Sequence, residues 1–326
     1  MGLFGKKQKR ETRVFFVTDV HGSTRCFLKF INAARVYEPD VLLLGGDITG
    51  KRVVPLVKQP DGRYEGHLAG RDHVLESESE IAAFEKAAAD GGLYAYRTSA
   101  DEVKQIEAEP ELIEDVFVKL AQERLQQWLD VADERLADTD VKLIINCGND
   151  DPFELDEMID RSSAASFAEG RLIDIDERRT LVSCGFANLT PWHCQRDVPE
   201  EEIARRINAS INGRGSDDRQ LIFNMHCPPY DSGLDVCPLL TEVLAPVLEG
   251  GQPVTGPVGS TAVRDAIESY EPILSLHGHI HESRCAARLG PTLAINPGSE
   301  YPDGVLRGAL VDLSEQGVMS YVLTSG

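Results

Sequence analysis

The sequence predicts an α/β fold with a largely parallel, buried sheet, and three observations favour this class. Apolar, β-branched runs at 13–18 (RVFFVT) and 40–44 (DVLLL) flank an amphipathic helix candidate at 24–36, which gives a βαβ opening. Similar strand candidates recur at 141–147, 221–225 and 273–276. Each run leads into a loop rich in Gly, Asn, Asp or His. Open α/β sheets bind ligands at the carboxyl ends of their strands, so we expect a functional site there.

Three hairpin candidates follow in the second half of the chain. They span 171–186, 284–296 and 308–323, and the first two turn at 176–179 and 289–291. We expect these hairpins to form a second, more antiparallel sheet.

Residues 52–138 depart from the strand and helix alternation. A hairpin candidate surrounds 59–62 (QPDG), and 76–138 has the pattern of two or three helices, with a capping box from Ser99 to Glu102. Apolar residues follow at roughly helical spacing: Leu112, Val116, Leu120, Leu125, Trp128 and Val131. We interpret 52–138 as a mostly helical, acidic insertion that acts as a cap or an oligomerisation element, giving a homo-oligomer, rather than performing chemistry.

Charge and composition exclude several classes. The net charge is −21, and 19 acidic residues face only 6 basic ones between Asp72 and Asp140, so long nucleic acids are not expected partners. The longest apolar runs, 14–17 and 41–44, are far shorter than the ~20 residues of a membrane-spanning helix, so no membrane partner is expected. Seven scattered cysteines without a Cys-x-x-Cys pair favour the reducing cytoplasm. We expect a flexible basic tail over 1–12.

Five polar motifs follow the predicted strands in order. They are Asp19-Val20-His21, Gly46-Asp47, Gly148-Asn149-Asp150-Asp151, His226, and Gly278-His279-Ile280-His281. Residues at i and i+2 share a face of a strand, so the two side chains of an Asp-x-His or His-x-His motif can reach one point. Any single His could instead be a hydrogen-bonded core residue. Taken together, Asp, Asn and His without Cys form a ligand set that suits Mn, Fe, Zn or Mg.

This ordered set resembles the signature of the calcineurin-like metallophosphoesterases, over about 13–52 and 139–323. The start at 19–23 (DVHGS) and the turn at 296–299 (NPGS) are most similar to the Icc/YfcE-like phosphodiesterase branch. The resemblance implies a four-layer αββα sandwich of two mixed sheets over 13–326, interrupted by the insertion. It implies two divalent metal ions: Asp19, His21 and His281 on one, Asn149, His226 and His279 on the other, and Asp47 bridging. We expect Mn²⁺ first, with Fe, Zn, Ni or Mg as alternatives.

The chemistry of such a site is phosphoester hydrolysis. Two cations about 3.5–4 Å apart lower the pKa of a bridging water toward ~7, and the resulting hydroxide attacks the phosphorus of a small phosphodiester, for example a cyclic nucleotide or a nucleotide. We therefore assign catalytic roles to Asp47, Asn149 and Asp150. The alternative is a metal-binding fold that serves as a protein-interaction or regulatory module.

Asp150 departs from the family pattern, which most often has His at this position. An Asp near two cations stays ionised and is a poor proton donor, so the sequence predicts a preference for good leaving groups. Asp150 is therefore either a loop residue or a catalytic residue.

Several residues near the motifs have two interpretations. Lys51 is either a surface residue or a cation that offsets phosphate charge, and His193 is either a loop residue or a proton donor at the rim. We expect His277 to be buried support. The remaining candidates are expected to be packing residues (Cys147 and Cys227) or surface residues (His67 and His73).

Overall fold

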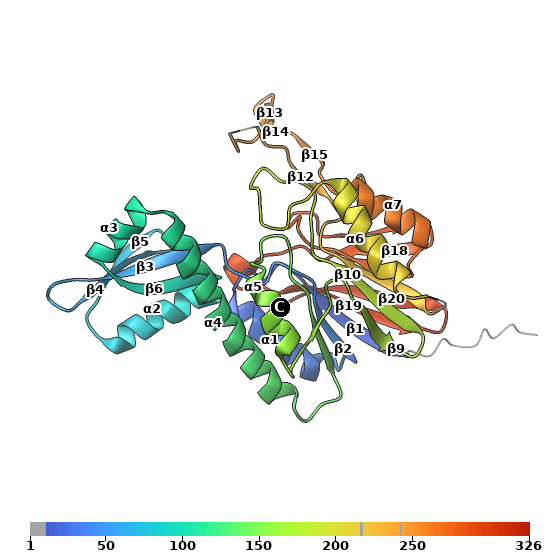
Figure 1. The fold of residues 1–326 in the computed structure, drawn as a ribbon, viewed down its shortest axis with the longest axis horizontal. Helices are drawn as coiled ribbons and strands as arrows, with labels where there is room; N and C mark the ends of the chain where they lie inside the picture. The colour runs from blue at the N-terminus through green and yellow to red at the C-terminus, as the bar shows by residue number, and fades with distance from the viewer. Residues whose placement is uncertain (1–10, 216–217, 242) are drawn as a thin grey trace, which may run out of the picture.

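Two six-stranded sheets pack face to face, and helices cover the outer face of each (Figure 1). The structure is a computed structural model that describes residues 11–215, 218–241 and 243–326. The first sheet has the order β20 (Gly317–Ser325), β19 (Arg307–Ser314), β1 (Thr12–Val17), β2 (Val41–Leu44), β7 (Lys142–Ile145) and β8 (Ser166–Phe167). The second has the order β17 (Cys285–Leu289), β18 (Thr292–Asn296), β16 (Leu274–Leu276), β11 (Gln220–Met225), β10 (Arg179–Cys184) and β9 (Leu172–Asp176). Residues 1–10 of the expected tail over 1–12 lie outside the described residues.

The side chains of β1 explain how the layers form. Val14 and Phe16 pack in the cluster between the two sheets, together with Ile222 of the second sheet. Phe15 and Val17 point to the other face and pack in the cluster beneath the helices. Because successive side chains of a strand alternate between its faces, the continuous apolar run of β1 reflects burial on both sides.

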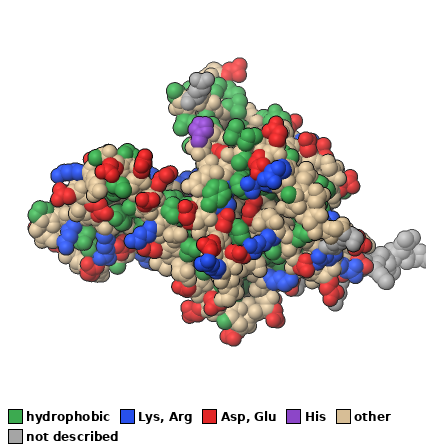
Figure 2. Space-filling view, viewed as in Figure 1, with side chains coloured by type: hydrophobic (Ala, Val, Ile, Leu, Met, Phe, Trp, Pro, Cys, Tyr) green, Lys and Arg blue, Asp and Glu red, His purple; other side chains and the backbone are tan. Residues whose placement is uncertain are grey.

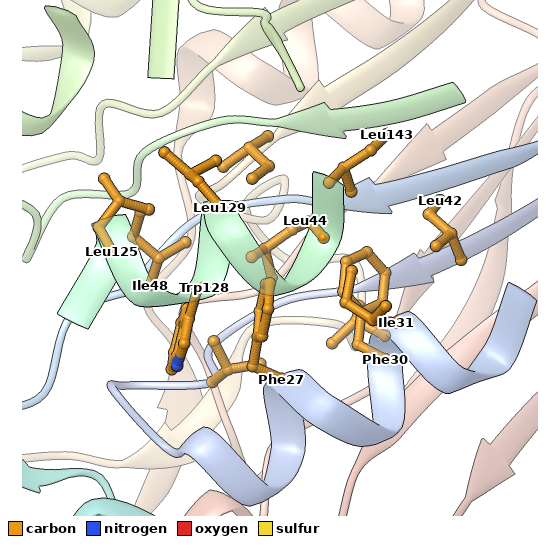
Figure 3. Close-up of a cluster of buried hydrophobic side chains, with 14 of the residues drawn as sticks. Phe27, Phe30, Ile31, Leu42, Leu44, Ile48, Leu125, Trp128, Leu129 and Leu143 are labelled. Atoms are coloured by element: carbon orange, nitrogen blue, oxygen red, sulfur yellow. The ribbon is translucent and has the colours of Figure 1, made fainter. Parts of the chain in front are cut away.

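Five helices form the two outer layers. The first sheet is covered by α1 (Thr24–Val36), α4 (Glu111–Leu136) and α5 (Glu154–Arg161), and the second by α6 (Glu200–Asn212) and α7 (Thr261–Tyr270). The Ser23 hydroxyl caps α1 by accepting the Cys26 N–H at 3.3 Å. Figure 3 shows the core beneath α1 and α4, where the rings of Phe27 and Trp128 stack 4.3 Å apart. The four-layer αββα sandwich that the resemblance implied is confirmed.

All three predicted hairpins are present, but the prediction of a second, more antiparallel sheet is wrong. The pairs β9–β10 and β17–β18 lie in the second sheet, whereas β19–β20 lies in the first, where β19 pairs antiparallel with β1. The inner pairs of the second sheet, β10–β11, β11–β16 and β16–β18, are parallel. The helices α6 and α7 supply crossovers that these parallel strands require. Each sheet contains both parallel and antiparallel pairs, so both sheets are mixed.

A separate small sheet occupies the first part of the predicted insertion. Its order is β5 (Arg71–Leu75), β4 (Tyr64–Leu68), β3 (Arg52–Lys58) and β6 (Leu93–Ser99), and α2 (Glu78–Asp90) and α3 (Ala100–Ala108) accompany it. It has its own apolar cluster, formed by Val54, Leu56, Leu75, Ile81 and Phe84. The hairpin predicted at 59–62 is confirmed, since β3 and β4 pair antiparallel across it. The strand β6 was not predicted.

Helix α4 belongs to the main core rather than to the small sheet. Its buried face contributes Ala121, Leu125, Trp128, Leu129, Ala132 and Leu136 to the cluster beneath the helices of the first sheet. The apolar stripe predicted for this region therefore packs against the sandwich itself.

A thin arm projects from the second sheet (Figure 1). It consists of two short ribbons, β12 (Val236–Pro238) with β15 (Thr255–Pro257) and β13 (Leu248–Glu249) with β14 (Gln252–Pro253), and the sequence did not predict it. Among the described residues, no helix combines the length and the apolar character needed to cross a membrane.

Candidate metal centre

The polar motifs converge where the carboxyl ends of five strands meet. Loops after β1, β2 and β7 of the first sheet carry Asp19, His21, Asp47 and Asn149, and loops after β11 and β16 of the second carry His226, His279 and His281. Parallel neighbours within each sheet bring these ends to one edge, as expected for ligand sites in α/β sheets. The structure thus brings together all seven residues proposed as metal ligands.

The first group of potential metal ligands is Asp19, His21 and His281. The Nε2 atoms of the two imidazoles lie 3.1 Å apart. Oδ1 of Asp19 lies 3.3 Å from Nε2 of His281 and 3.8 Å from Nε2 of His21. The other ring nitrogen of His21, Nδ1, lies 3.3 Å from the Thr49 carbonyl oxygen, which orients the ring.

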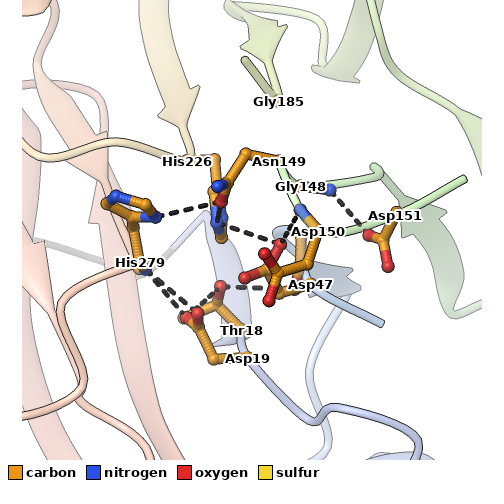
Figure 4. A network of polar contacts seen from close by, with 12 residues as sticks. Thr18, Asp19, Asp47, Gly148, Asn149, Asp150, Asp151, Gly185, His226 and His279 are labelled. Carbon is orange, nitrogen blue, oxygen red and sulfur yellow. Dashed lines mark hydrogen bonds and ion pairs between the residues drawn. The ribbon is translucent and has the colours of Figure 1, made fainter. Parts of the chain in front are cut away.

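The second group is Asp47, His226 and His279, with Asn149 between them (Figure 4). Nε2 of His226 lies 3.2 Å from Oδ1 of Asp47 and 3.2 Å from Oδ1 of Asn149. Nδ1 of His279 lies 3.0 Å from the same Asn149 oxygen. The second carboxylate oxygen of Asp47, Oδ2, lies 3.7 Å from Nε2 of His21, so Asp47 stands between the two groups.

Strained backbone marks these loops. Asp19, His21, Asp47 and His279 all have positive φ angles, of 53°, 39°, 49° and 66°. Such conformations are costly for residues other than Gly and persist only where the surroundings hold them. Here the backbone of Asp19 donates to the Gly46 carbonyl, that of His21 donates to the Asp47 carbonyl, and that of His279 donates to the Asp19 carboxylate. The ligand loops therefore hold one another in place.

Two glycines allow the ligands to approach the backbone closely. A Cβ at Gly148 would lie 2.2 Å from Oδ1 of Asp47, and a Cβ at Gly278 would lie 2.2 Å from Oδ2 of Asp19. Both distances are too short for any side chain. This explains in physical terms why Gly precedes Asn149 and His279 in the motifs.

Two further carboxylates support the site without joining it. Oδ1 of Asp197 accepts a hydrogen bond from Nδ2 of Asn149 at 2.9 Å, which turns the Asn149 oxygen toward the histidines. Asp151 accepts the backbone N–H groups of Ile48, Thr49 and Gly148 and so ties two ligand loops together. No role was predicted for Asp151 although it lies in a motif, and nothing marked Asp197, which is 48 positions from Asn149.

The electrostatics of the cluster call for a cation. Burial raises the pKa of Asp47 to about 6. Burial lowers the pKa of His226, but the charge and hydrogen bond of Asp47 outweigh it and raise this pKa to about 9. The Asp47 carboxylate thus favours positive charge at His226, and a divalent metal ion would supply that charge in place of a proton. Buried carboxylates and imidazole nitrogens at these distances are a donor set that divalent metals prefer. The residues present therefore fit metal ions.

Asp150 and Lys51 lie at the edge of the cluster. The Asp150 N–H donates to Oδ1 of Asp47 at 3.1 Å, and its carboxylate pairs with Nζ of Lys51 at 2.9 Å and accepts the Cys194 S–H at 2.8 Å. Burial raises the pKa of Asp150, but the charge of Lys51, together with His21, lowers it well below its usual range. Asp150 is thus an ionised group beside the metal ligands, in agreement with its expected weakness as a proton donor.

The remaining candidates do not join the cluster. Nδ1 of the buried His277 lies 2.9 Å from the Met225 carbonyl oxygen, which is the supporting role predicted for it. His193 is exposed, and no contact with the cluster is recorded for it among the described residues. Cys147 and Cys227 are buried, and His67 is exposed on the small sheet, as predicted. His73 is half-buried instead, because its ring packs edge-on against that of Phe84.

Comparisons with known proteins bear on the fold. No protein-family model matches the chain. An uncharacterized protein of Methanocaldococcus jannaschii, MJ1162, is 27% identical over 143 residues. The match covers 43% of this chain and 58% of that protein, so it spans less than two thirds of the relative.

Two solved structures share the fold over nearly the whole chain. One crystal structure aligns with a TM-score of 0.54 and 15% identity and covers 96% of this chain and 98% of its own. The protein TT1561 of Thermus thermophilus aligns with a TM-score of 0.51 and 14% identity and covers 97% and 98%. YfcE, a phosphoesterase from E. coli, aligns with a TM-score of only 0.31 at 12% identity and covers 95% of this chain and 98% of its own.

Fold and site together define an α/β sandwich whose strand ends carry buried His and Asp groups that can hold metal ions. This is the four-layer architecture that the resemblance implied.

Proposed function

We propose that this protein is a dinuclear metal-dependent phosphoesterase of the calcineurin-like superfamily that hydrolyses phosphodiester bonds. The observation that supports it is the convergence of five strand-end loops into two ligand groups with Asp47 between them. We also place the protein near the Icc/YfcE-like branch. Its NPGS turn lies at the site, where the Ser299 hydroxyl donates to the Asp19 carbonyl at 2.7 Å and the Ser299 N–H donates to that of His281.

The seven ligands would hold two ions, with Mn²⁺ preferred and Fe, Zn, Ni or Mg as alternatives. Two bound cations would lower the pKa of a shared water and neutralise phosphate oxygens during in-line displacement. The residues of the chain position these partners. Asp47 offers one carboxylate oxygen to each group, and Asn149 presents its amide oxygen because Asp197 holds the amide nitrogen.

The proposed substrate is a small phosphodiester with a good leaving group. Asp150 occupies the place of a potential proton donor, and its ionised carboxylate pairs with Lys51 instead. A leaving group that needs no protonation suits such a site, because general acid assistance is usually worth ~10²- to 10⁴-fold. Cyclic nucleotides and nucleotide diesters both belong to the proposed class.

Charge supports a small substrate over a polymer. The net charge of −21 disfavours long nucleic acids, and acidic side chains are spread over the visible face of the molecule among Lys and Arg (Figure 2). We further propose a cytoplasmic location, because all seven cysteines are free. We also propose that the protein forms a homo-oligomer through the 52–138 insertion.

A substrate panel with Mn²⁺ tests this function. We expect kcat/KM for an aryl diester such as bis-nitrophenyl phosphate to exceed that for an alkyl phosphomonoester by at least ~10²-fold. Comparable values for the two would contradict the leaving-group argument. Metal uptake without hydrolysis of any phosphoester would favour the alternative of a metal-binding interaction module.

A further inference from the structure

Lys51 lies at the junction between the metal-ligand loop and the small sheet. It follows the 46–50 loop and directly precedes β3, and its side chain is 48% exposed. Asp150 is the one partner that the structure records for its ammonium group among the described residues. An ammonium group has three N–H donors, so donors remain for another acceptor.

The ion pair places Lys51 near the first ligand group. The Asp150 carboxylate that pairs with it lies 3.9 Å from Nδ1 of His21. The Tyr301 ring lies against that of His21, with centroids 4.7 Å apart. Asp150 and Tyr301 therefore both lie beside His21, and Lys51 joins this edge of the cluster through Asp150.

A half-exposed ion pair by itself contributes little stability. At this position, however, an unpaired Asp150 carboxylate would repel an incoming phosphate, since one of its oxygens lies within 4.8 Å of potential ligand atoms of His21 and Asp47. Lys51 removes this repulsion and leaves a cation within reach of a group bound at the metal ligands.

We propose that Lys51 is a substrate-binding residue that donates a hydrogen bond to a non-bridging phosphoryl oxygen, and that Asp150 positions it. This inference rests on the proposed phosphoesterase function. A charge-assisted hydrogen bond to a phosphoryl oxygen is among the stronger polar contacts, and it strengthens as charge develops in the transition state. Asp150 then acts through Lys51 and does not transfer a proton.

The test compares Lys51→Met and Lys51→Arg with the control Lys58→Met, at the exposed last residue of β3. In the Mn²⁺-loaded protein we expect Lys51→Met to lower kcat/KM for bis-nitrophenyl phosphate by ~10²- to 10³-fold. It should also weaken binding of inorganic phosphate, measured by calorimetry, by at least ~10-fold. Lys51→Arg should retain most of the kcat/KM and most of the phosphate affinity, and Lys58→Met should change neither quantity. All three variants should keep the wild-type metal content.

The outcomes separate this inference from the proposed function. If the wild type is active and Lys51→Met changes both quantities by less than about twofold, the role of Lys51 is overturned. Loss of metal from Lys51→Met would overturn it as well, because Lys51 would then support the ligand loop. If the wild type hydrolyses no phosphoester, the proposed function fails, while phosphate binding still decides whether Lys51 contacts phosphate.

Asp150→Asn tests the positioning role. We expect kcat to fall by roughly 10-fold while phosphate binding is not weakened, because the repelling charge is removed along with the anchor of Lys51. Unchanged kcat would contradict this role.

Discussion

His21 and His281 are 260 residues apart in the chain, yet their Nε2 atoms lie 3.1 Å from each other and face the same Asp19 carboxylate oxygen. Nδ1 of His21 faces the Thr49 carbonyl oxygen, so a neutral His21 presents the lone pair of Nε2 to this point. A divalent cation satisfies both nitrogens and the carboxylate. The relationship between these residues is thus the clearest geometric sign of a metal site.

Asp47→Asn should remove metal and activity together. Asp47 offers Oδ1 to the His226 side and Oδ2 to the His21 side, and the amide would remove the negative charge that both groups share. We expect metal content, measured by elemental analysis, and the hydrolysis rate to fall in parallel. His67→Ala is the control, since His67 is exposed in the small sheet and pairs with Asp72. Two retained metals with near-normal turnover in Asp47→Asn would refute the assignment.

Asp197→Ala should weaken metal binding although Asp197 is not one of the proposed ligands. Asp197 fixes the Asn149 amide and also accepts the backbone N–H groups of Thr190 and Cys194. Loss of such a supporting partner typically costs 10- to 100-fold in metal affinity, and we expect a loss of about that size in a Mn²⁺ titration. Asp265→Ala, on the exposed face of α7, is a matched control. Equal affinities for the two variants would show that Asn149 needs no such orientation.

The two tryptophans should differ sharply in their contribution to stability. Trp128 is 3% exposed and stacks on Phe27, whereas Trp192 is 61% exposed. We expect Trp128→Ala to lower the free energy of unfolding by about 3–5 kcal/mol, and Trp192→Ala to change it by less than about 0.5 kcal/mol. Urea unfolding measures both. A small effect of Trp128→Ala would mean that α4 is not part of the main core.

Tyr94→Phe should change how stability depends on pH. Tyr94 is buried, and its hydroxyl accepts the Gly50 N–H at 3.0 Å. Losing this acceptor should cost about 1 kcal/mol at pH 8. Burial raises the pKa of Tyr94 from its usual value near 10 to about 12.

The sign of the pH effect follows from this raised pKa. The wild type keeps its full advantage below pH 10, and it loses stability relative to Tyr94→Phe as the pH rises from 10 toward 12, by up to about 1.4 kcal/mol per pH unit. Unfolding in urea at pH 8 and pH 11 should therefore show the wild-type advantage of about 1 kcal/mol disappearing or reversing at the higher pH. A gap that widens at pH 11 would contradict the burial of Tyr94.

The sequence could predict the candidate site residues because strand ends leave local patterns, and the family resemblance implied their roles as ligands. Asp19 and His21 share one loop, as do His279 and His281, and each follows an apolar run that predicts a strand. The supporting contacts could not be predicted in this way. Asn149 meets Asp197, and Lys51 meets Asp150, only after the chain has folded, and no local pattern records such pairs.

Parts of the fold were also beyond the sequence patterns. The apolar stripe of α4 predicts a buried face, but amphipathicity alone does not identify the surface that this face packs against. In the structure it packs against the core of the sandwich. The hairpin Arg307–Ser325 could not be assigned to a sheet in advance, because its alternation fits either one until β19 pairs with β1. The projecting arm could not be predicted because its strands are only two or three residues long and show no clear hydrophobic periodicity.

The most direct test of the account is a titration of Mn²⁺ into the metal-free protein while the hydrolysis of bis-nitrophenyl phosphate is followed. We expect the rate to be negligible without metal, to rise as Mn²⁺ is added, and to saturate near two equivalents per chain, because both ligand groups must be filled. Saturation at one equivalent would contradict the dinuclear site. No hydrolysis at any ratio, in protein that binds Mn²⁺, would contradict the phosphoesterase function itself.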